Sequence, residues 1–203
     1  MAIPQVNSIP KYELTIPSTQ KVTTFRPFLV KEQKVMLIAL ESQDQQAILR
    51  AIMDTLSATV DSIDVNQLST FDIEYMFTVV RSKSVGETVD LMLPCSNCEH
   101  LNEINIDISD LEIKIPPDKS NIIKLNDQYE LHLRYPTYKQ VLDNAGNEKT
   151  IVENLYTTSL LSMDKLISEE EQLVLDDEEE SERIRFMDNL LQEQMDQVLL
   201  TVV

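Results

Sequence analysis

The chain has 203 residues with ordinary proportions of hydrophobic (42%) and charged (26%) side chains, enough for one compact domain or two small ones. Its formal net charge of −18 argues against nucleic acid and anionic membranes as partners, because both attract Lys and Arg to their phosphate groups. With two glycines and no G-x-G-x-x-G or G-x-x-x-x-G-K motif, it also lacks the glycine-rich loops that hold nucleotide phosphates.

The N-terminal residues 1–5 have neither the basic start nor the apolar stretch of a signal peptide. We therefore expect the protein to remain in the cytoplasm where it is made. No apolar run approaches the roughly 20 residues that span a bilayer, so we expect no membrane partner. In a reducing cytoplasm the two cysteines, Cys95 and Cys98, are not expected to form a stable disulfide.

A β-hairpin and a helix are the first predicted elements. Polar and apolar side chains alternate over residues 11–16 and 21–25, which is the period of half-buried strands, and residues 17–20 form the turn between them. A helix is predicted over residues 31–42, a segment without glycine or proline. Its apolar residues are Val35, Leu37, Ile38 and Leu40.

Two further helices are predicted before residue 87. One begins near Asp44, a residue type that caps helices, and carries an apolar stripe at a spacing of four residues. The next begins at Ser69 or Thr70 and ends at Gly86, because glycine commonly follows the last helical residue. The apolar stripe of the first of these helices consists of Ile48, Ile52 and Leu56, with Met53 beside it. The predicted buried face of the second holds Phe71, Tyr75, Met76, Val79 and Val80.

A second hairpin, over residues 87–108, carries a Cys-x-x-Cys turn. Residues 87–93 form its first predicted strand, and residues 94–98 form a tight turn. In the returning strand, over 103–108, the isoleucines alternate strictly with polar residues and therefore lie on one face. A third hairpin is predicted over residues 122–133.

The chain changes character after Pro136. A short helix is predicted over 138–145, and almost everything beyond it is predicted to be helical. Residues 150–203 hold 14 acidic and 3 basic side chains, a net charge of −11. These features predict an α+β fold in two parts. The first, over residues 1–136, has β-hairpins with packed helices and a zinc-ribbon-like hairpin, and the second, over 137–203, is acidic and mostly helical.

Cys95 and Cys98 are candidate zinc ligands, because a tight turn between two strands can direct two sulfurs at one ion, as in half of a zinc ribbon. A structural zinc site needs four ligands, and the chain has no second cysteine pair. His100 or His132 would have to complete the set, and the close spacing of His100 to the turn argues against it. The alternative is a remnant ribbon knuckle or an ordinary hairpin turn with buried thiols, in either case without a cofactor.

Thiol chemistry at the same turn is a further alternative. A Cys–His nucleophile pair is conceivable, but acidic neighbours such as Glu99 raise a thiol pKa and disfavour it. A thioredoxin-like redox pair needs a helix directly after the turn, where a strand is predicted here. We therefore expect no catalytic residues and no enzyme activity.

Residues 169–182 contain nine acidic side chains. They lack the D-x-[DN]-x-[DN]-G pattern of a calcium-binding loop, so an EF-hand is not predicted. The segment is either a solvated charged surface or a docking surface for a basic partner.

Apolar residues recur at helical spacing near the end of the chain, over 183–203. This stripe is either core or a subunit interface, since exposed apolar ends commonly mark partner contacts. The candidate interface residues are Met187, Leu191, Met195, Val198 and Leu199.

Several segments carry a family resemblance: 11–19 (KYELTIPST), 25–34 (FRPFLVKEQK), 37–42 (LIALES), 68–77 (LSTFDIEYMF), 81–87 (RSKSVGE) and 102–107 (NEINID). Together with the Cys-x-x-Cys turn, they resemble the baseplate hub protein family of T4-like contractile-tailed bacteriophages over residues 11–115. The acidic tail resembles that family more loosely. Within these motifs, Arg81 and Lys83 are candidate interface residues or members of internal salt bridges.

The resemblance implies a non-enzymatic protein that builds the central hub of the baseplate through protein–protein interfaces. Its expected partners are other hub or wedge proteins in a hetero-oligomeric assembly, with no nucleic acid and no membrane. It is expected in the host cytoplasm during assembly and in the tail baseplate of the virion. Two alternatives stay open: a non-virion assembly chaperone for another hub protein, and a zinc- or thiol-dependent enzyme.

Overall fold

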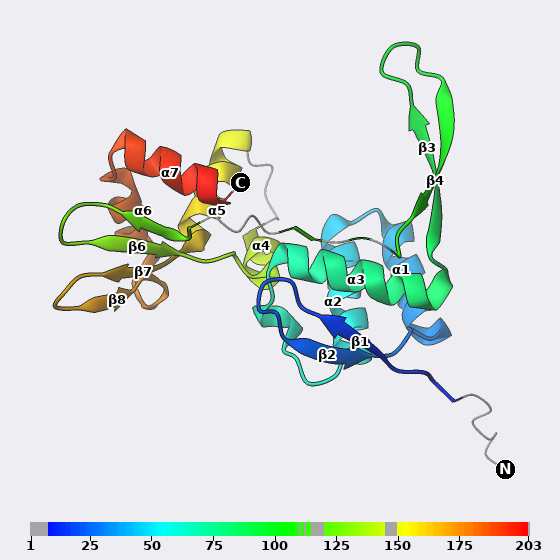
Figure 1. Ribbon diagram of the computed structural model, residues 1–203. Coiled ribbons are helices and arrows are strands. Elements are labelled where there is room, and N and C mark those ends of the chain that lie inside the picture. Colours follow the sequence, from blue (N-terminus) through cyan, green and yellow to red (C-terminus); the bar gives the residue numbers. More distant parts are fainter. Residues whose placement is uncertain (1–7, 110, 112, 115–119, 145–149, 203) are drawn as a thin grey trace. The chain divides into compact units, whose positions relative to one another are not determined.

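The computed structural model describes residues 8–109, 111, 113–114, 120–144 and 150–202. These residues form helices and small antiparallel sheets, which confirms the predicted α+β class. The chain divides into two compact units, Met1–Ile113 and Lys114–Val203, and each is described separately (Figure 1).

The first unit begins with the predicted hairpin and continues with helices. Strand β1 (Tyr12–Thr15) pairs antiparallel with β2 (Val22–Phe25). Three α-helices and a short 3₁₀ helix follow: α1 (Val30–Ser42), α2 (Gln45–Thr59), η1 (Val65–Gln67) and α3 (Thr70–Val85). The hairpin and helices enclose an apolar core that includes Ile16, Phe25, Leu56, Val65, Ile73, Met76 and Val80.

The ends of these helices follow the predicted capping chemistry. The Asp44 side chain accepts a hydrogen bond from the backbone N–H of Gln46 at the start of α2. Ser69 and Asp72 form a capping box at the start of α3. Gly86 follows α3 with a φ of +138°, a conformation that side chains rarely adopt. Ser69 is therefore the N-cap of α3, and Thr70 is its first helical residue.

The first unit ends in a second hairpin, β3 (Thr88–Pro94) and β4 (Leu101–Asp107). The two strands form a sheet of their own, and Figure 1 shows them as a long two-stranded ribbon. Residues 87–108 are called the arm below.

The second unit is built on a four-stranded antiparallel sheet in the order β5-β6-β7-β8. Its strands are β5 (Ile122–Lys124), β6 (Glu130–Leu133), β7 (Met163–Ile167) and β8 (Gln172–Val174). Its helices are α4 (Tyr138–Asn144), α5 (Ile151–Ser162), η2 (Leu175–Asp177), α6 (Glu180–Asp188) and α7 (Gln192–Val202). Its core cluster comprises Ile123, Leu131, Leu133, Leu160, Met163, Leu175, Met187, Met195 and Val198.

The observed division falls between Ile113 and Lys114, whereas the sequence pattern placed a boundary after residue 136. The reason is strand pairing over a long sequence separation: β6 pairs with β7, which places Leu131 opposite Leu166. Residues 122–133 therefore belong with the C-terminal elements.

The C-terminal part also contains more strand than its pattern predicted. Strands β7 and β8 occupy residues 163–167 and 172–174, within a region predicted to be mostly helical. The amphipathic stretch over 183–203 forms two helices, α6 and α7, with a turn between them near Asn189. In the described part of the chain, no helix is both long and apolar enough to cross a membrane.

Candidate functional site

The arm is held together by an uninterrupted ladder between two seven-residue strands. Its register places Val89 opposite Ile106 and Leu91 opposite Ile104. At its base, the N–H of Ile108 donates to the carbonyl oxygen of Glu87 over 2.8 Å. The alternation seen in the sequence therefore becomes a hairpin with two chemically different faces.

One face of the arm is apolar and exposed. It is formed by Val89, Leu91, Leu93, Ile104 and Ile106, which alternate along the two strands. Leu91 and Ile104 keep 37% and 38% of their surface accessible, values more typical of a surface than of a sheet interior. Ile108, at the base, is buried. Two-stranded hairpins are marginal alone and normally pack one face on something else, so this face is a candidate interface.

The opposite face of the arm is polar and acidic except toward the tip, where it carries Met92, Pro94 and Leu101. The side-chain amide of Asn105 donates to Asp90 across the strands over 2.6 Å. Asp107 accepts hydrogen bonds from the N–H and hydroxyl of Ser109, which hold the pKa of its carboxyl below the ordinary value. Between Lys83 and Lys114 the sequence contains no Lys or Arg. The arm is therefore amphipathic and carries charge of one sign.

The Cys-x-x-Cys turn closes the tip of the arm. The N–H of Cys95 donates to the carbonyl oxygen of His100 over 2.8 Å, and the N–H of Glu99 donates to that of Cys95 over 2.9 Å. The Cys95 sulfur accepts hydrogen bonds from the N–H groups of Asn97 and Cys98 and from the Cys98 side chain, which lower its pKa. The lowered pKa favours the thiolate, which is the form that binds metals and acts as a nucleophile.

The predicted zinc ligands belong to two different units. Cys95, Cys98 and His100 lie at the tip of the arm, whereas His132 lies on β6 of the second unit, opposite Ile122 and Lys165. Within the residues that the structure describes, no three His, Cys, Asp or Glu side chains are grouped closely enough to hold a metal ion. The two cysteines therefore provide half of a zinc-ligand set.

Arg81 and Lys83, near the end of α3, have different environments. Lys83 forms an ion pair with Glu87 at the base of the arm, and this pair raises the Lys83 pKa. Arg81 is half-buried, and its Nη1 atom lies buried without a hydrogen-bond acceptor among the described residues. Lys83 thus belongs to an internal salt bridge, one of the two roles expected for it.

The C-terminal candidate interface residues divide between core and surface. Met187, Met195 and Val198 are buried in the core cluster of the second unit, because α6 and α7 pack back on α5 and the sheet. Leu199 is half-buried against the same cluster, and Leu191 is exposed between the two helices. Of the predicted interface residues, Leu191 is therefore the one that stays exposed for contact with a partner.

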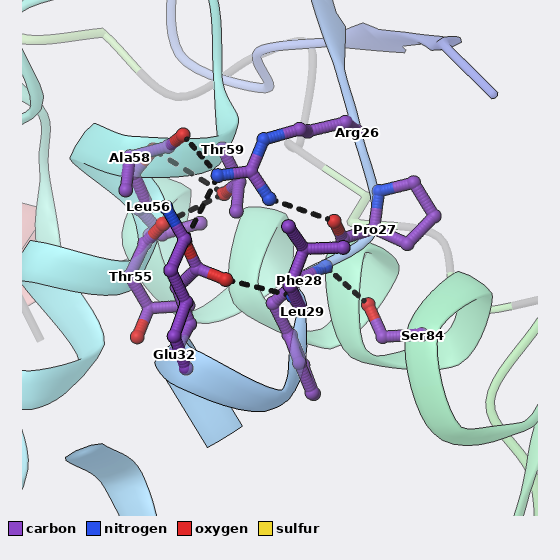
Figure 2. A network of polar contacts seen from close by, with 11 residues as sticks. Arg26, Pro27, Phe28, Leu29, Glu32, Thr55, Leu56, Ala58, Thr59 and Ser84 are labelled. Atoms are coloured by element: carbon purple, nitrogen blue, oxygen red, sulfur yellow. Dashed lines mark hydrogen bonds and ion pairs between the residues drawn. The ribbon is translucent and has the colours of Figure 1, made fainter. Parts of the chain in front are cut away.

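A polar network at the segment FRPFLVKE was not predicted from the sequence (Figure 2). The Arg26 guanidinium donates from Nη2 to Glu32 Oε1 and to the carbonyl oxygen of Ala58, both over 2.9 Å. The other Glu32 oxygen accepts the N–H of Leu29 over 2.7 Å at the start of α1. The Phe28 N–H donates to Ser84 Oγ of α3 over 3.0 Å.

This network joins the end of β2 to all three helices of the first unit, so the segment has a structural role. Burial of Glu32 raises its pKa, but the hydrogen bonds and charge of Arg26 and the Leu29 N–H outweigh this, and the pKa lies below its ordinary value. The available sequence signal was Glu32 at the third helical position, which is typical of a capping residue.

A second exposed apolar surface lies on α1. The residues predicted to form its apolar side, Val35, Leu37, Ile38 and Leu40, are all exposed. Helix α1 packs on α2, and its buried residues are Glu32 and Ala39. Its remaining apolar residues extend around the helix rather than along one stripe, which explains why periodicity did not predict its buried side.

Comparison with known proteins adds three findings. The chain is 33% identical over 100 residues to the DNA-directed RNA polymerase subunit beta of Clostridium novyi (strain NT). That match covers 45% of this chain and only 8% of the polymerase subunit, so it is confined to a small part of that protein. No solved structure matches the chain.

The third finding covers almost the whole chain. The family model described as T4 bacteriophage base plate protein matches residues 9–202, which include the arm, the polar network and the second unit. The protein therefore belongs to the T4 bacteriophage base plate protein family.

Proposed function

We propose that this baseplate protein is a structural subunit of the baseplate hub and works through protein–protein interfaces rather than by catalysing a reaction. The family match supports a structural role in the baseplate, and the resemblance of the motifs over residues 11–115 supports the hub. The observation that carries the interface mechanism is the exposed apolar face of the arm, with Leu91 and Ile104 uncovered by the described part of the chain.

The proposed partners are other hub or wedge proteins in a hetero-oligomeric assembly. The protein would meet them in the host cytoplasm and remain with them in the tail baseplate. Stable assemblies bury large, rather apolar surfaces, and the arm offers such a surface on one face.

A non-virion assembly chaperone is the alternative, and one observation favours it. The acidic residues Glu169–Glu171 and Asp177–Glu180 are exposed, so they can shield a basic surface on another hub protein and later release it. Both roles use interfaces, and they differ in where the protein is found after assembly.

Mass spectrometry of purified virions, with infected-cell lysate as the reference, tests the proposal. A structural subunit is expected at a fixed, stoichiometric number of copies per tail. Abundance in the lysate together with absence from the virion would reject the hub-subunit role and support the chaperone.

Zinc binding by Cys95 and Cys98 stays a separate proposal, supported by the sulfur-directed N–H groups at the tip of the arm. Metal analysis of the purified wild-type protein and of Cys95→Ser/Cys98→Ser tests it. Zinc in the wild type and its loss in the variant are expected if the site is real. Equal zinc content in both would reject this site, and normal phage assembly with the variant would reject any essential thiol or zinc chemistry.

A further inference from the structure

We propose that the arm docks its apolar face on an apolar surface with a basic rim, carried by a different protein of the baseplate. This inference rests on the proposed interface function and adds the chemistry of the partner. It combines three properties of the arm: an uncovered apolar face, charge of one sign, and an extended shape.

The apolar face needs a partner from outside the arm. In the described residues, β3 and β4 pair only with each other, so neither strand is covered laterally by a third strand. All residues of β4, and all residues of β3 except Val89, are exposed. The strictly alternating leucines and isoleucines have the pattern of a face that is buried in the functional state.

The charge of the arm selects the kind of partner. Residues 87–108 hold five acidic side chains and no Lys or Arg: Glu87, Asp90, Glu99, Glu103 and Asp107. Three of them, Asp90, Glu103 and Asp107, lie on the polar face, which is opposite the apolar face, and are spread along the length of the arm. A partner with Lys and Arg around an apolar floor complements this arrangement.

A second copy of the chain is a poor partner for the same reason. It would bring another five acidic side chains close to the first five, within a protein whose net charge is already −18. Like charges brought together at an interface repel each other and select against such pairing.

The shape of the arm sets the extent of the surface that it contacts. Each strand has seven residues, so the ladder is about 23 Å long at about 3.3 Å per residue. Its edges also present unpaired backbone groups, which a strand of the partner can extend. The partner is therefore expected to offer an elongated apolar groove rather than a small pocket.

Site-specific photo-crosslinking in assembled phage tails tests this placement. The full chain is produced during infection with Leu91→p-benzoyl-phenylalanine on the apolar face, and the matched control carries Met92→p-benzoyl-phenylalanine on the polar face. We expect crosslinks from position 91, at least tenfold above those from position 92, to a segment of another baseplate protein that is rich in Lys and Arg. Crosslinks chiefly to a second copy, to the chain itself, or to a neutral or acidic segment would overturn the proposal, as would equal yields from both positions.

Charge reversal provides an independent test that does not place a bulky group in the interface. Asp90→Lys/Glu103→Lys/Asp107→Lys is compared with Glu41→Lys/Asp54→Lys/Asp188→Lys. The control changes the same number of exposed acidic residues, outside the arm and outside the acidic segment 169–182. With folding checked by circular dichroism, we expect the arm variant to lower the amount of protein in purified tails at least tenfold and the control to lower it less than twofold. Equal incorporation of the arm variant and the wild type would overturn the proposal, and so would equal losses in both variants.

The outcomes separate this inference from the proposed function. If the wild-type protein is absent from virions, the hub-subunit role fails, whatever the arm contacts. If the protein is present in virions but the arm shows no preferred basic partner, only the docking proposal fails.

Discussion

The two hairpins of the first unit close with the same turn but have different surroundings. In β1–β2, the N–H of Ile16 donates to Lys21 and the N–H of Gln20 donates back to Ile16, over 2.9 and 2.8 Å. In the arm, Cys95 bonds to His100 and Glu99 bonds back to Cys95 in the same pattern, over 2.8 and 2.9 Å. Gln20 and Glu99 even share a positive φ, 56° and 58°. The Cys-x-x-Cys turn is thus a version of a turn that the chain also builds without cysteine.

The difference lies in what each hairpin packs against. Ile16 is buried, and the N–H of Ser18 in its turn donates to the carboxylate of Asp72 on α3 over 2.9 Å. In the arm, the corresponding N–H of Asn97 is directed to the sulfur of Cys95. The first hairpin is completed by helices of its own unit, whereas the arm satisfies its turn locally and leaves its apolar face exposed. Equal local geometry is therefore packed into the core in one hairpin and leaves an exposed apolar face in the other.

Matched leucine truncations should give the largest contrast between the two hairpins. Leu14 of β1 is 4% exposed, and Leu91 of β3 is 37% exposed. We expect Leu14→Ala to lower the free energy of unfolding by about 2–5 kcal/mol, because it leaves a cavity in the core. Leu91→Ala should cost about 1 kcal/mol or less, since it weakens only a cross-strand pair with Ile104. Urea unfolding followed by circular dichroism measures both values.

Hydrogen exchange by mass spectrometry assigns the urea transition to the first unit, which matters because the chain has two units. Equal losses in the two leucine variants would mean that the arm is as well packed as the first hairpin in the free protein. That result would contradict the distinction drawn between them.

The contrast also shows how far the sequence predicts this fold. Alternation over residues 11–25 and 87–108 predicted both hairpins, and the residue types Asp44, Ser69 and Gly86 predicted the ends of helices. These features depend on neighbours within a few residues. Alternation predicts that one face of a hairpin is buried, but it does not identify the element that covers that face. It therefore did not distinguish the two hairpins.

Features that depend on distant residues were not predictable in the same way. The pairing of β6 with β7 crosses more than thirty residues and moves the division of the chain to residue 113. The bonds from Arg26 to Glu32 and Ala58 depend on how three elements meet. At the candidate site, the sequence identified the cysteines and the isoleucine row of the arm, but the exposure of that row follows only from tertiary packing.

Removing Arg26 should make the first hairpin more like the arm by detaching it from the helices. Arg26→Ala leaves Glu32, whose side chain is 8% exposed, without its main counter-charge. We expect a loss of about 2–3 kcal/mol, somewhat below the cost of breaking a wholly buried pair. Lys31→Ala is the matched control, because Lys31 also lies near Glu32 but its side chain is 72% exposed. It should cost about 0.5 kcal/mol or less in the same urea experiment. Similar losses of stability in both variants would show that the hydrogen bonds of Arg26 contribute no more to stability than a nearby positive charge does.

Acid should weaken the same anchor in the wild type. The pKa of Glu32 is lower in the folded protein than its ordinary value, so folding favours the ionised form. Its contribution is therefore fully present above its ordinary pKa and is lost as the pH falls through the lowered value. Glu32→Gln cannot titrate, so we expect the stability gap between wild type and variant to shrink as the pH falls below about 4.5. A gap that stays constant from neutral pH to pH 3, measured by urea unfolding, would contradict this assignment.

A substitution in the turn that both hairpins share should give a smaller effect of opposite sign, a gain in stability. The reason is that glycine relieves the strain of a positive φ. Glu99→Gly should stabilise the arm by about 0.5–1 kcal/mol, since Glu99 has a φ of 58° and no described hydrogen bond from its side chain is lost. Gln20→Gly relieves the same strain but removes the bond from Gln20 Nε2 to the carbonyl oxygen of Pro17, 2.8 Å long, so its net effect should be near zero. Slower amide exchange across β3 and β4 in Glu99→Gly, without a matching change around β1 and β2 in Gln20→Gly, is the expected result.

The smallest difference between the hairpins is which group accepts the hydrogen bonds from the turn N–H groups. Alkylation kinetics can detect this difference even where the free energy of unfolding does not change. In the Cys98→Ser variant, Cys95 is the sole thiol and keeps the hydrogen bonds from the N–H groups of residues 97 and 98, which lower its pKa. The rate of reaction with iodoacetamide, measured in EDTA against pH, should therefore reach half its maximum at a lower pH in the folded variant than in the same variant unfolded in urea. Coincident profiles would mean that the N–H groups do not hold the sulfur, as the Asp72 carboxylate holds Ser18 in the first hairpin. The conclusion that the turn of the arm satisfies its own N–H groups, without help from the helices, would then be wrong.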